Sequence, residues 1–132
     1  MRAAVLAFLL VVGGTSVSAT TASAAPPVDC VTKAYLPTTN GTYTYARSTL
    51  TCAPNFGLLA SAVKSQVQES VLAVWVSRGT AATNGSAGLS NTVTQSYNCN
   101  GHGTDNWRTR GDGTDNYSRA TADISSLVSL TC

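Results

Sequence analysis

The side chains best suited to chemistry in this sequence gather between positions 102 and 110. His102 is the type of residue that accepts and releases protons near neutral pH, and Asp105 follows it three residues later. On a strand, Arg108 and Arg110 share one face while Trp107 occupies the other. A pair of guanidinium groups of this kind can hold a carboxylate or another anion, although solvated arginines paired with Asp105 or Asp112 are the simpler expectation. We therefore predict His102, Arg108 and Arg110 as binding residues.

These side chains do not form a recognisable catalytic set. The chain has one histidine, and its six acidic side chains are dispersed. A serine hydrolase would also need a nucleophile motif and a large α/β scaffold. We predict that the protein is not an enzyme, and a small hydrolase that uses His102 and Asp105 is a third hypothesis behind the two given below.

The tetrapeptide Gly-Thr-Asp-Asn occurs twice, at 103–106 and at 113–116. Asp and Asn side chains bond to their own backbone in turns, so the repeat predicts paired turns at the same end of the fold. A calcium site built on Asp105, Asp112 and Asp115 fits less well, because its spacing matches no calcium loop and hard cations take about six or more oxygen ligands. We predict no metal ion and no cofactor.

The four cysteines are Cys30, Cys52, Cys99 and Cys132. An even number of cysteines in a secreted chain predicts disulfides formed in an oxidising compartment. None of them has the close C-x2–4-C spacing of a structural zinc site. We therefore predict two structural disulfides.

The first residues have the layout of a secretory signal peptide. Arg2 is followed by an apolar run over 3–12 and by Ala22-Ser23-Ala24, a typical cleavage site. The apolar run is shorter than the roughly 20 residues of a membrane span. We predict a signal peptide over 1–24, one secreted domain over 25–132, no membrane span, and a location outside the cell or at its envelope.

Charge and composition exclude some partners. The formal net charge of the chain is +2, and charged residues make up 11% of it. A nucleic-acid binder needs a concentrated basic face, which this composition does not supply, so we expect no nucleic-acid partner. The low charge and the patterned apolar residues also argue against disorder.

Alternating polar and apolar residues, separated by turns rich in Gly and Asn, predict an all-β fold. Segment 58–70 fits either a helical stripe or an alternating strand, and its β-rich neighbours favour a strand. Gly111-Asp112-Gly113 is expected to end the strand that contains Trp107. About seven short strands predict a small immunoglobulin-like antiparallel β-sandwich. The expected strands are 31–36, 42–52, 58–70, 71–76, 89–99, 107–110 and 120–132, and the core candidates of the last one are Ile124, Leu127, Val128 and Leu130.

Two disulfide connectivities compete. A tight hairpin centred on Asn40-Gly41 would bring Cys30 near Cys52, which leaves Cys99 to pair with Cys132. The turn alone does not decide between this pairing and the next.

The competing pairing rests on Tyr97, which lies two residues before Cys99. This is the layout of the tyrosine corner in immunoglobulin-type sandwiches, in which the cysteine bridges the two sheets. Its partner would then be Cys52, and Cys30 and Cys132 would join the first and last strands. We favour this nested pairing.

Three segments, 48–52, 97–104 and Asn106-Trp107-Arg108, resemble small secreted proteins that are common in actinomycetes. The shared signature is Y-x-C-x-G-x-G-T-x-x-(W/Y/F)-R. The resemblance covers part of the domain and implies a signal peptide, a β-sandwich and a disulfide between the cysteines at 52 and 99. The additional cysteines at 30 and 132 depart from that group, and their mutual pairing follows by elimination. The group has no assigned function.

We therefore expect a monomeric, secreted, non-enzymatic protein that acts by binding. Its candidate ligands are a cell-wall polymer, an extracellular polysaccharide or another protein. A small diffusible effector, such as a bacteriocin or an inhibitor of a secreted enzyme, is the alternative, because a disulfide-stapled module with exposed loops suits that role too.

Overall fold

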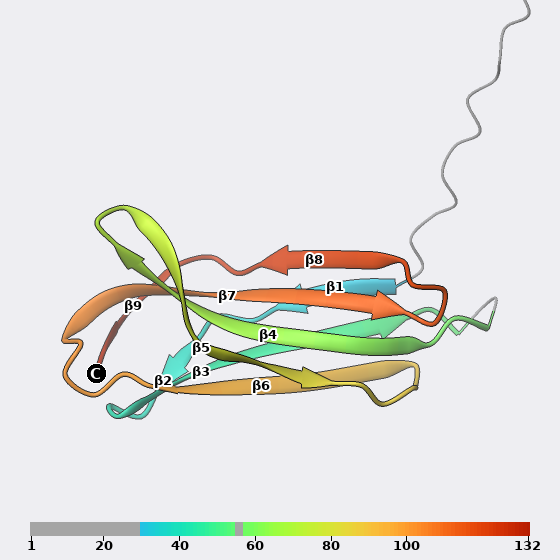
Figure 1. Cartoon of the computed structure of the whole chain (residues 1–132), viewed down its shortest axis with the longest axis horizontal. Helices are drawn as coiled ribbons and strands as arrows, with labels where there is room; N and C mark the ends of the chain where they lie inside the picture. The colour runs from blue at the N-terminus through green and yellow to red at the C-terminus, as the bar shows by residue number, and fades with distance from the viewer. Residues whose placement is uncertain (1–29, 55–56) are drawn as a thin grey trace, which may run out of the picture.

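The computed structural model describes residues 30–54 and 57–132, in which nine strands form an elongated β-sandwich (Figure 1). The predicted signal peptide lies outside the described residues and stays a prediction. No helix in the described part of the chain is long and apolar enough to cross a membrane. The strands are β1 (Cys30–Ala34), β2 (Thr38–Thr39), β3 (Tyr43–Cys52), β4 (Ala60–Val71), β5 (Val74–Asn84), β6 (Ser90–Asn98), β7 (Thr104–Asp115), β8 (Ala120–Ile124) and β9 (Val128–Thr131).

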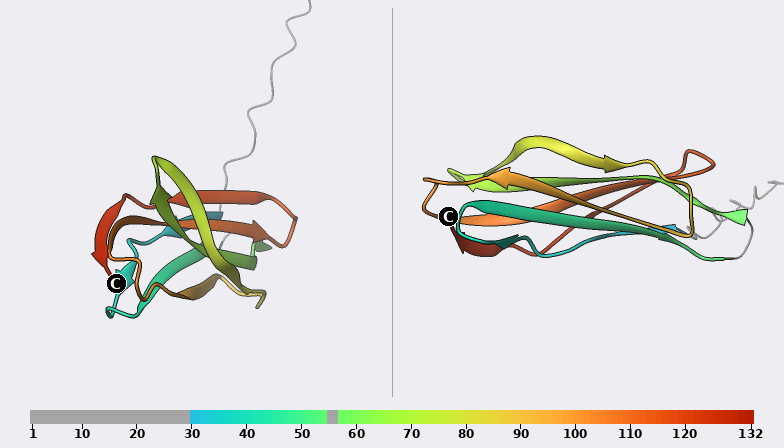
Figure 2. Two further views of the ribbon diagram at one scale, coloured as in Figure 1. Left: turned by 60° about the vertical axis from the view of Figure 1, so that its left-hand side comes forward. Right: turned by 90° about the horizontal axis from the view of Figure 1, so that it is seen from below.

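The strands form two antiparallel sheets that lie face to face (Figure 2). In the first sheet, β3 pairs with β1 and β2 along one edge and with β6 along the other. In the second sheet the order is β5-β4-β7, and both β8 and β9 pair with the outer edge of β7. The predicted all-β, immunoglobulin-like sandwich with two disulfides is confirmed. The structure has two more strands than the seven expected. The segment 120–132 divides into β8 and β9, and the two-residue strand β2 was not expected from the sequence.

The core between the sheets consists of two apolar clusters. One surrounds Leu50 and Val63, and the other surrounds Val67 and Trp107. Trp107 is fully buried. Ser48 and Ser65 are also fully buried between the sheets, where Ser48 Oγ donates to Ser65 Oγ at 3.0 Å and Ser65 Oγ donates to the Ala46 carbonyl at 2.9 Å. The interior is therefore thin and partly polar.

Two core predictions for the last stretch of chain are wrong. Ile124 and Leu127 are 48% and 60% exposed. Ile124 pairs with Arg110 on the outward face of the second sheet, and Leu127 lies in the connection between β8 and β9. Val128 and Leu130 are half-buried, and Leu130 packs against the Trp107 cluster.

Segment 58–70 is largely strand β4, which confirms the prediction of a strand over a helix. The predicted strand over 71–76 is wrong, because the chain reverses within it. Leu72 and Ala73 have φ angles of 50° and 66°, and Val71 pairs directly with Val74 across this two-residue turn. Such turns favour Asn and Gly, so an apolar Leu-Ala turn carries no local signal in the sequence.

Strand β7 continues through the two glycines that were expected to end it. Gly111 and Gly113 face the core, and a Cβ atom on them would lie 2.7 Å from Ser48 Oγ and 2.8 Å from Leu50 Cδ1, respectively. The glycines are needed because the first sheet approaches β7 closely, which is a common reason for glycine in a strand interior.

The repeated Gly-Thr-Asp-Asn segments lie at the two ends of β7. Segment 103–106 begins the strand, and segment 113–116 ends it. The prediction of paired turns at the same end is therefore wrong, because equivalent residues of the two copies lie ten positions apart along one continuous strand, about 33 Å. The second copy does form a turn, in which Asp115 accepts backbone bonds from Tyr117 and Arg119.

The favoured disulfide pairing is also wrong, and the hairpin-based alternative is the one observed. The bonds are Cys30–Cys52 and Cys99–Cys132. Cys30 lies directly opposite Cys52 in the β1–β3 ladder. Cys99 lies at the other end of β3, where its N–H donates to the Thr42 carbonyl at 2.9 Å. About ten residues of strand, some 33 Å, therefore separate Cys52 from Cys99, which excludes a bond between them.

Candidate functional site

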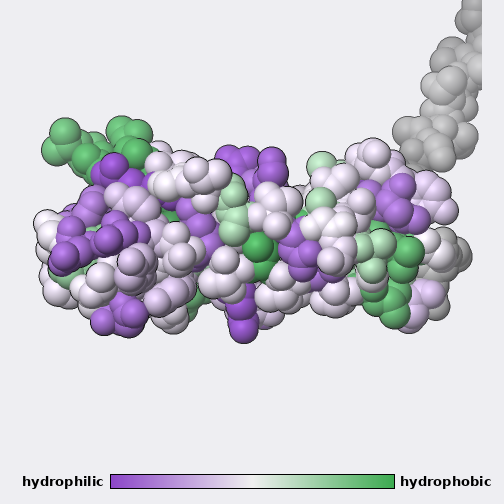
Figure 3. Space-filling view, turned by 60° about the horizontal axis from the view of Figure 1, so that its bottom comes forward, coloured by the Kyte–Doolittle hydropathy of each residue, from purple (hydrophilic) through white to green (hydrophobic). Residues whose placement is uncertain are grey.

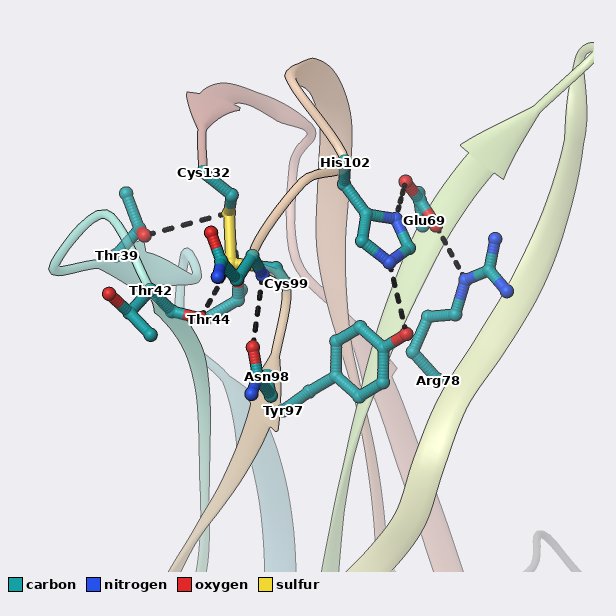
Figure 4. Close-up of polar contacts among 11 residues, drawn as sticks. Thr39, Thr42, Thr44, Glu69, Arg78, Tyr97, Asn98, Cys99, His102 and Cys132 are labelled. Carbon is teal, nitrogen blue, oxygen red and sulfur yellow. Dashed lines mark hydrogen bonds and ion pairs between the residues drawn. A yellow bond between two sulfur atoms is a disulfide. The ribbon is translucent and has the colours of Figure 1, made fainter.

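The most concentrated polar network surrounds His102, in the connection between β6 and β7. Its Nδ1 lies 3.0 Å from Glu69 Oε1, near the end of β4, and its Nε2 lies 3.2 Å from Tyr97 Oη, near the end of β6. In Figure 4 the imidazole stands between the carboxylate and the phenol hydroxyl. The ring of His102 also packs edge-on against Tyr97, with centroids 5.7 Å apart. Glu69, 33 positions away in the sequence, and Tyr97, five positions away, thus orient this one histidine.

Glu69 is the buried charge of the network. Its side chain is only 3% exposed, and Arg78 of β5 donates from Nε to Glu69 Oε2 at 2.5 Å. Burial raises the pKa of Glu69, but hydrogen bonds from His102 and Arg78 and their charges outweigh burial, so the net pKa is lowered. Glu69 is therefore a carboxylate at neutral pH, so it accepts a hydrogen bond from the N–H of His102 Nδ1. Nε2 on the other side of the ring is hydrogen-bonded to the Tyr97 hydroxyl.

Glu69 was not among the predicted site residues, although the sequence holds a signal for it. It continues the alternation of Val63 and Val67, and all three side chains face the core. A charged residue in an apolar face is rarely buried without a partner. This pattern identifies Glu69 as a buried charge, but it does not identify its partners His102 and Arg78, which lie elsewhere in the sequence.

Arg108 lies on the outward face of the second sheet, away from the His102 network. Its Nε donates to Gln68 Oε1 at 2.8 Å, and its guanidinium carbon lies 4.1 Å from the centre of the Trp75 ring. Burial lowers the pKa of Arg108, and the neighbouring charge of Arg110 lowers it further. Contacts within the protein thus already occupy this guanidinium.

Arg110 lies on the same outward face and pairs with Asp112, with Nε 3.1 Å from Oδ2. The hydrogen bond and charge of Asp112 raise the pKa of Arg110. The structure thus brings the two predicted arginines to one face but does not join them to His102. The role of these three residues in binding stays a prediction.

A groove with a volume of about 650 Å³ lies on the outward face of the first sheet, bordered by the β8–β9 connection. Tyr35 lines this groove, with the guanidinium carbon of Arg47 4.1 Å and Lys33 Nζ 5.1 Å from its ring centre. Within the described residues, neither Lys33 nor Arg47 takes part in an ion pair. The lining residues are Lys33, Ala34, Tyr35, Leu36, Thr38, Tyr45, Arg47, Thr94, Ser125 and Ser126.

The sequence predicts strands at 31–36 and 42–52 but not this groove. Arg47 comes beside Tyr35 because the Tyr35 N–H donates to the Arg47 carbonyl at 3.0 Å, where β1 leaves β3. The groove forms because the pairing of β1 with β3 sets Tyr35 beside Arg47 and because the β8–β9 connection lies next to them. No local pattern carries this information.

An apolar tip projects from one end of the molecule, at the turn between β4 and β5. Leu72 is 95% exposed and Val74 is 62% exposed. Figure 3 shows hydrophobic residues gathered at this end of the surface. A protruding apolar residue of this kind suits contact with another molecule.

Comparison with known proteins found no matching family, no matching curated protein and no matching solved structure. The resemblance to small secreted actinomycete proteins therefore stays a prediction. A function for this chain has to be argued from the geometry of its own sites.

Proposed function

We propose that this protein is a secreted, non-enzymatic binding module that recognises an acidic polysaccharide outside the cell or in its envelope. The groove around Tyr35 is its binding site. The observation that carries the proposal is the pair of cations, Lys33 and Arg47, that lie over the half-buried ring of Tyr35 and form no ion pair within the described residues.

The groove combines the two kinds of contact that an acidic sugar offers. The ring of Tyr45, which lines the groove beside Tyr35, can supply flat apolar area against which a sugar ring packs. Arg47 can grip a carboxylate or a phosphate with two parallel hydrogen bonds, and Lys33 adds a second positive charge. Thr and Ser hydroxyls along the rim can bond to sugar hydroxyls. An open groove also suits a chain better than a small, enclosed ligand.

Two features favour binding without turnover. Within the described residues, the groove lining contains no Asp, Glu or His, the usual acid–base groups of glycoside cleavage. In the His102 network, hydrogen bonds with Glu69 and Tyr97 engage both ring nitrogens. The proposal of secretion rests on the predicted signal peptide and agrees with two disulfides in one small domain.

The test is retention of the purified, oxidised protein on isolated cell walls and on insoluble acidic and neutral polysaccharides. We expect retention on an acidic polymer. The double variant Lys33→Gln/Arg47→Gln should bind it at least about tenfold more weakly, because it loses charge-assisted hydrogen bonds worth about 1.5 kcal/mol or more. Lys64→Gln is the matched control, since Lys64 is an exposed cation on the other sheet.

Equal weakening by Lys64→Gln would show a general charge effect and contradict the groove as the site. If Arg108→Gln and Arg110→Gln weaken retention and the groove variant does not, the site is the outward face of the second sheet instead. Retention by neither polymer nor wall would reject the proposal.

The diffusible effector remains the second candidate, and the apolar tip of the β4–β5 hairpin is the observation in its favour. Leu72 lies in the two-residue turn of this hairpin and is almost fully exposed. An inhibitor of a secreted enzyme needs such a preformed projection to fill a pocket of its target. Inhibition of growth or of a secreted enzyme, without retention on any polymer, would support this candidate.

A further inference from the structure

We propose that Glu69, His102 and Asp105 bind one divalent transition-metal ion of the Zn²⁺ class. Each residue offers one ligating atom, and the three atoms lie within 4.8 Å of one another. They come from the end of β4, the β6–β7 connection and the start of β7. This site is separate from the groove of the proposed function, and it would add a metal-binding activity to the protein.

The separation of the first two ligands suits a metal ion. His102 Nδ1 and Glu69 Oε1 lie 3.0 Å apart. Two ligands of tetrahedral Zn²⁺, each about 2.0 Å from the ion, lie about 3.3 Å apart. A shift of a few tenths of an ångström would therefore let an ion take the place of the proton that these two atoms share.

The outer hydrogen bonds of the network would hold both ligands in position. Arg78 bonds to Oε2 of Glu69 and leaves Oε1 to face His102. With Nδ1 on the ion, the remaining ring proton sits on Nε2 and is donated to Tyr97 Oη. Such bonds to the far side of metal ligands orient them and raise affinity. These positioning residues are already present in this structure (Figure 4).

Asp105 supplies the third ligand and the charge that the site needs. It is half-buried, shares the inward side of β7 with Trp107, and takes part in no ion pair of the described residues. Glu69 and Asp105 together carry two negative charges, of which Arg78 compensates one. An added dication would thus meet a net negative site, which favours its binding.

The donor set indicates the class of ion. One imidazole nitrogen with two carboxylate oxygens is a ligand set of Zn²⁺ sites, in which a water completes the tetrahedron. Ca²⁺ and Mg²⁺ take about six or more ligands, nearly all oxygen, and three side chains supply only two carboxylates here. We therefore expect Zn²⁺ to bind much more tightly than either.

The experiment is a calorimetric titration, in which Zn²⁺, Ca²⁺ and Mg²⁺ are each added to the chelator-treated, oxidised protein. We expect one Zn²⁺ per chain. Asp105→Asn should weaken the affinity at least about tenfold, and Tyr97→Phe should also weaken it about tenfold through the lost bond to the ring. Asp112→Asn is the matched control, because this exposed carboxylate lies on the same strand and faces outward.

A second readout does not depend on any variant. His102 is the only histidine of the chain, so its ring proton signals are identified in an NMR spectrum without assignment. We expect Zn²⁺ to shift or broaden them at one equivalent. Unchanged histidine signals at saturating Zn²⁺, or an affinity that Asp105→Asn leaves unaltered, would overturn the proposal. Ca²⁺ binding as tight as that of Zn²⁺ would overturn the class of ion.

Discussion

Asp115 is a buried charge whose role is structural. Its carboxylate accepts the backbone N–H groups of Tyr117 and Arg119 and pairs with the Arg119 guanidinium at 2.7 Å. Burial raises the pKa of Asp115, but the bonds from Arg119 and Tyr117 and the charge of Arg119 outweigh it, so the net pKa is lowered. This single side chain closes the turn between β7 and β8, and it does so in its ionised form.

The lowered pKa of Asp115 sets the direction of a pH effect. A carboxyl group with a lower pKa in the folded state stabilises the fold above its unfolded pKa of about 3.8. That stability is lost as the pH falls through the folded-state value. We expect Asp115→Asn to lower the free energy of unfolding by about 2 kcal/mol at pH 7 and to flatten its decline between about pH 5 and 2.

Urea unfolding at several pH values measures both effects of Asp115→Asn. Asp112→Asn is the control, since its exposed ion pair with Arg110 contributes less than about 1 kcal/mol. If both variants lost stability equally, or if the pH dependence of Asp115→Asn matched that of the native protein, the assigned role of Asp115 would be wrong.

At the scale of elements, β7 connects most of the molecule. It pairs with β4 on one side and with β8 and β9 on the other, and it places Trp107 in the core and Asp105 within 4.8 Å of the Glu69 and His102 ligand atoms. Gly111 and Gly113 let the first sheet approach β7 closely. These glycines were expected to end the strand, but β7 continues through them to Asp115.

The close approach at Gly113 predicts a cost for even one added methyl group. A Cβ there would press against Leu50 and Thr32, so we expect Gly113→Ala to destabilise the fold by about 1–3 kcal/mol. Gly85→Ala is the control, because its Cβ would meet no atom within 4 Å and its φ is not positive. Thermal unfolding compares the two, and equal melting temperatures would show that the sheets can separate at β7 without cost.

At the scale of the whole molecule, the two disulfides have different roles. Cys30–Cys52 joins neighbouring strands within the first sheet. Cys99 follows β6 of the first sheet and Cys132 follows β9 of the second, so their bond ties the two sheets together at the end near His102. It also anchors the last strand of the chain.

Peptide mapping under non-reducing conditions checks this connectivity directly. Lys and Arg residues separate all four cysteines, so trypsin places each cysteine in its own peptide. We expect linked peptides for Cys30–Cys52 and Cys99–Cys132 only. The double variant Cys99→Ala/Cys132→Ala should lower the free energy of unfolding by roughly 3–4 kcal/mol in the chain-entropy picture, and amide exchange in β9 should accelerate most. A linked Cys52–Cys99 peptide would contradict the fold itself.

Part of the His102 site is visible in the sequence, and part is not. The lone histidine and the nearby Asp105 identify a chemical centre, but its buried partner, Glu69, lies 33 positions away. Arg108 and Arg110 are adjacent in the pattern to His102, yet alternation along β7 sends them to the opposite face of the sheet. Proximity in the sequence therefore wrongly grouped Arg108 and Arg110 with His102, and it gave no indication of the contact between His102 and Glu69.

The sequence by itself determined the β class, most strand positions and the presence of two disulfides, because alternation with a period of two and turn chemistry act over a few residues. The tertiary structure alone decided which cysteines meet, why glycines lie within β7, and which side chains surround Tyr35 and His102. These outcomes depend on strand register and on how closely two sheets stack, and both are set by packing between segments far apart in the chain.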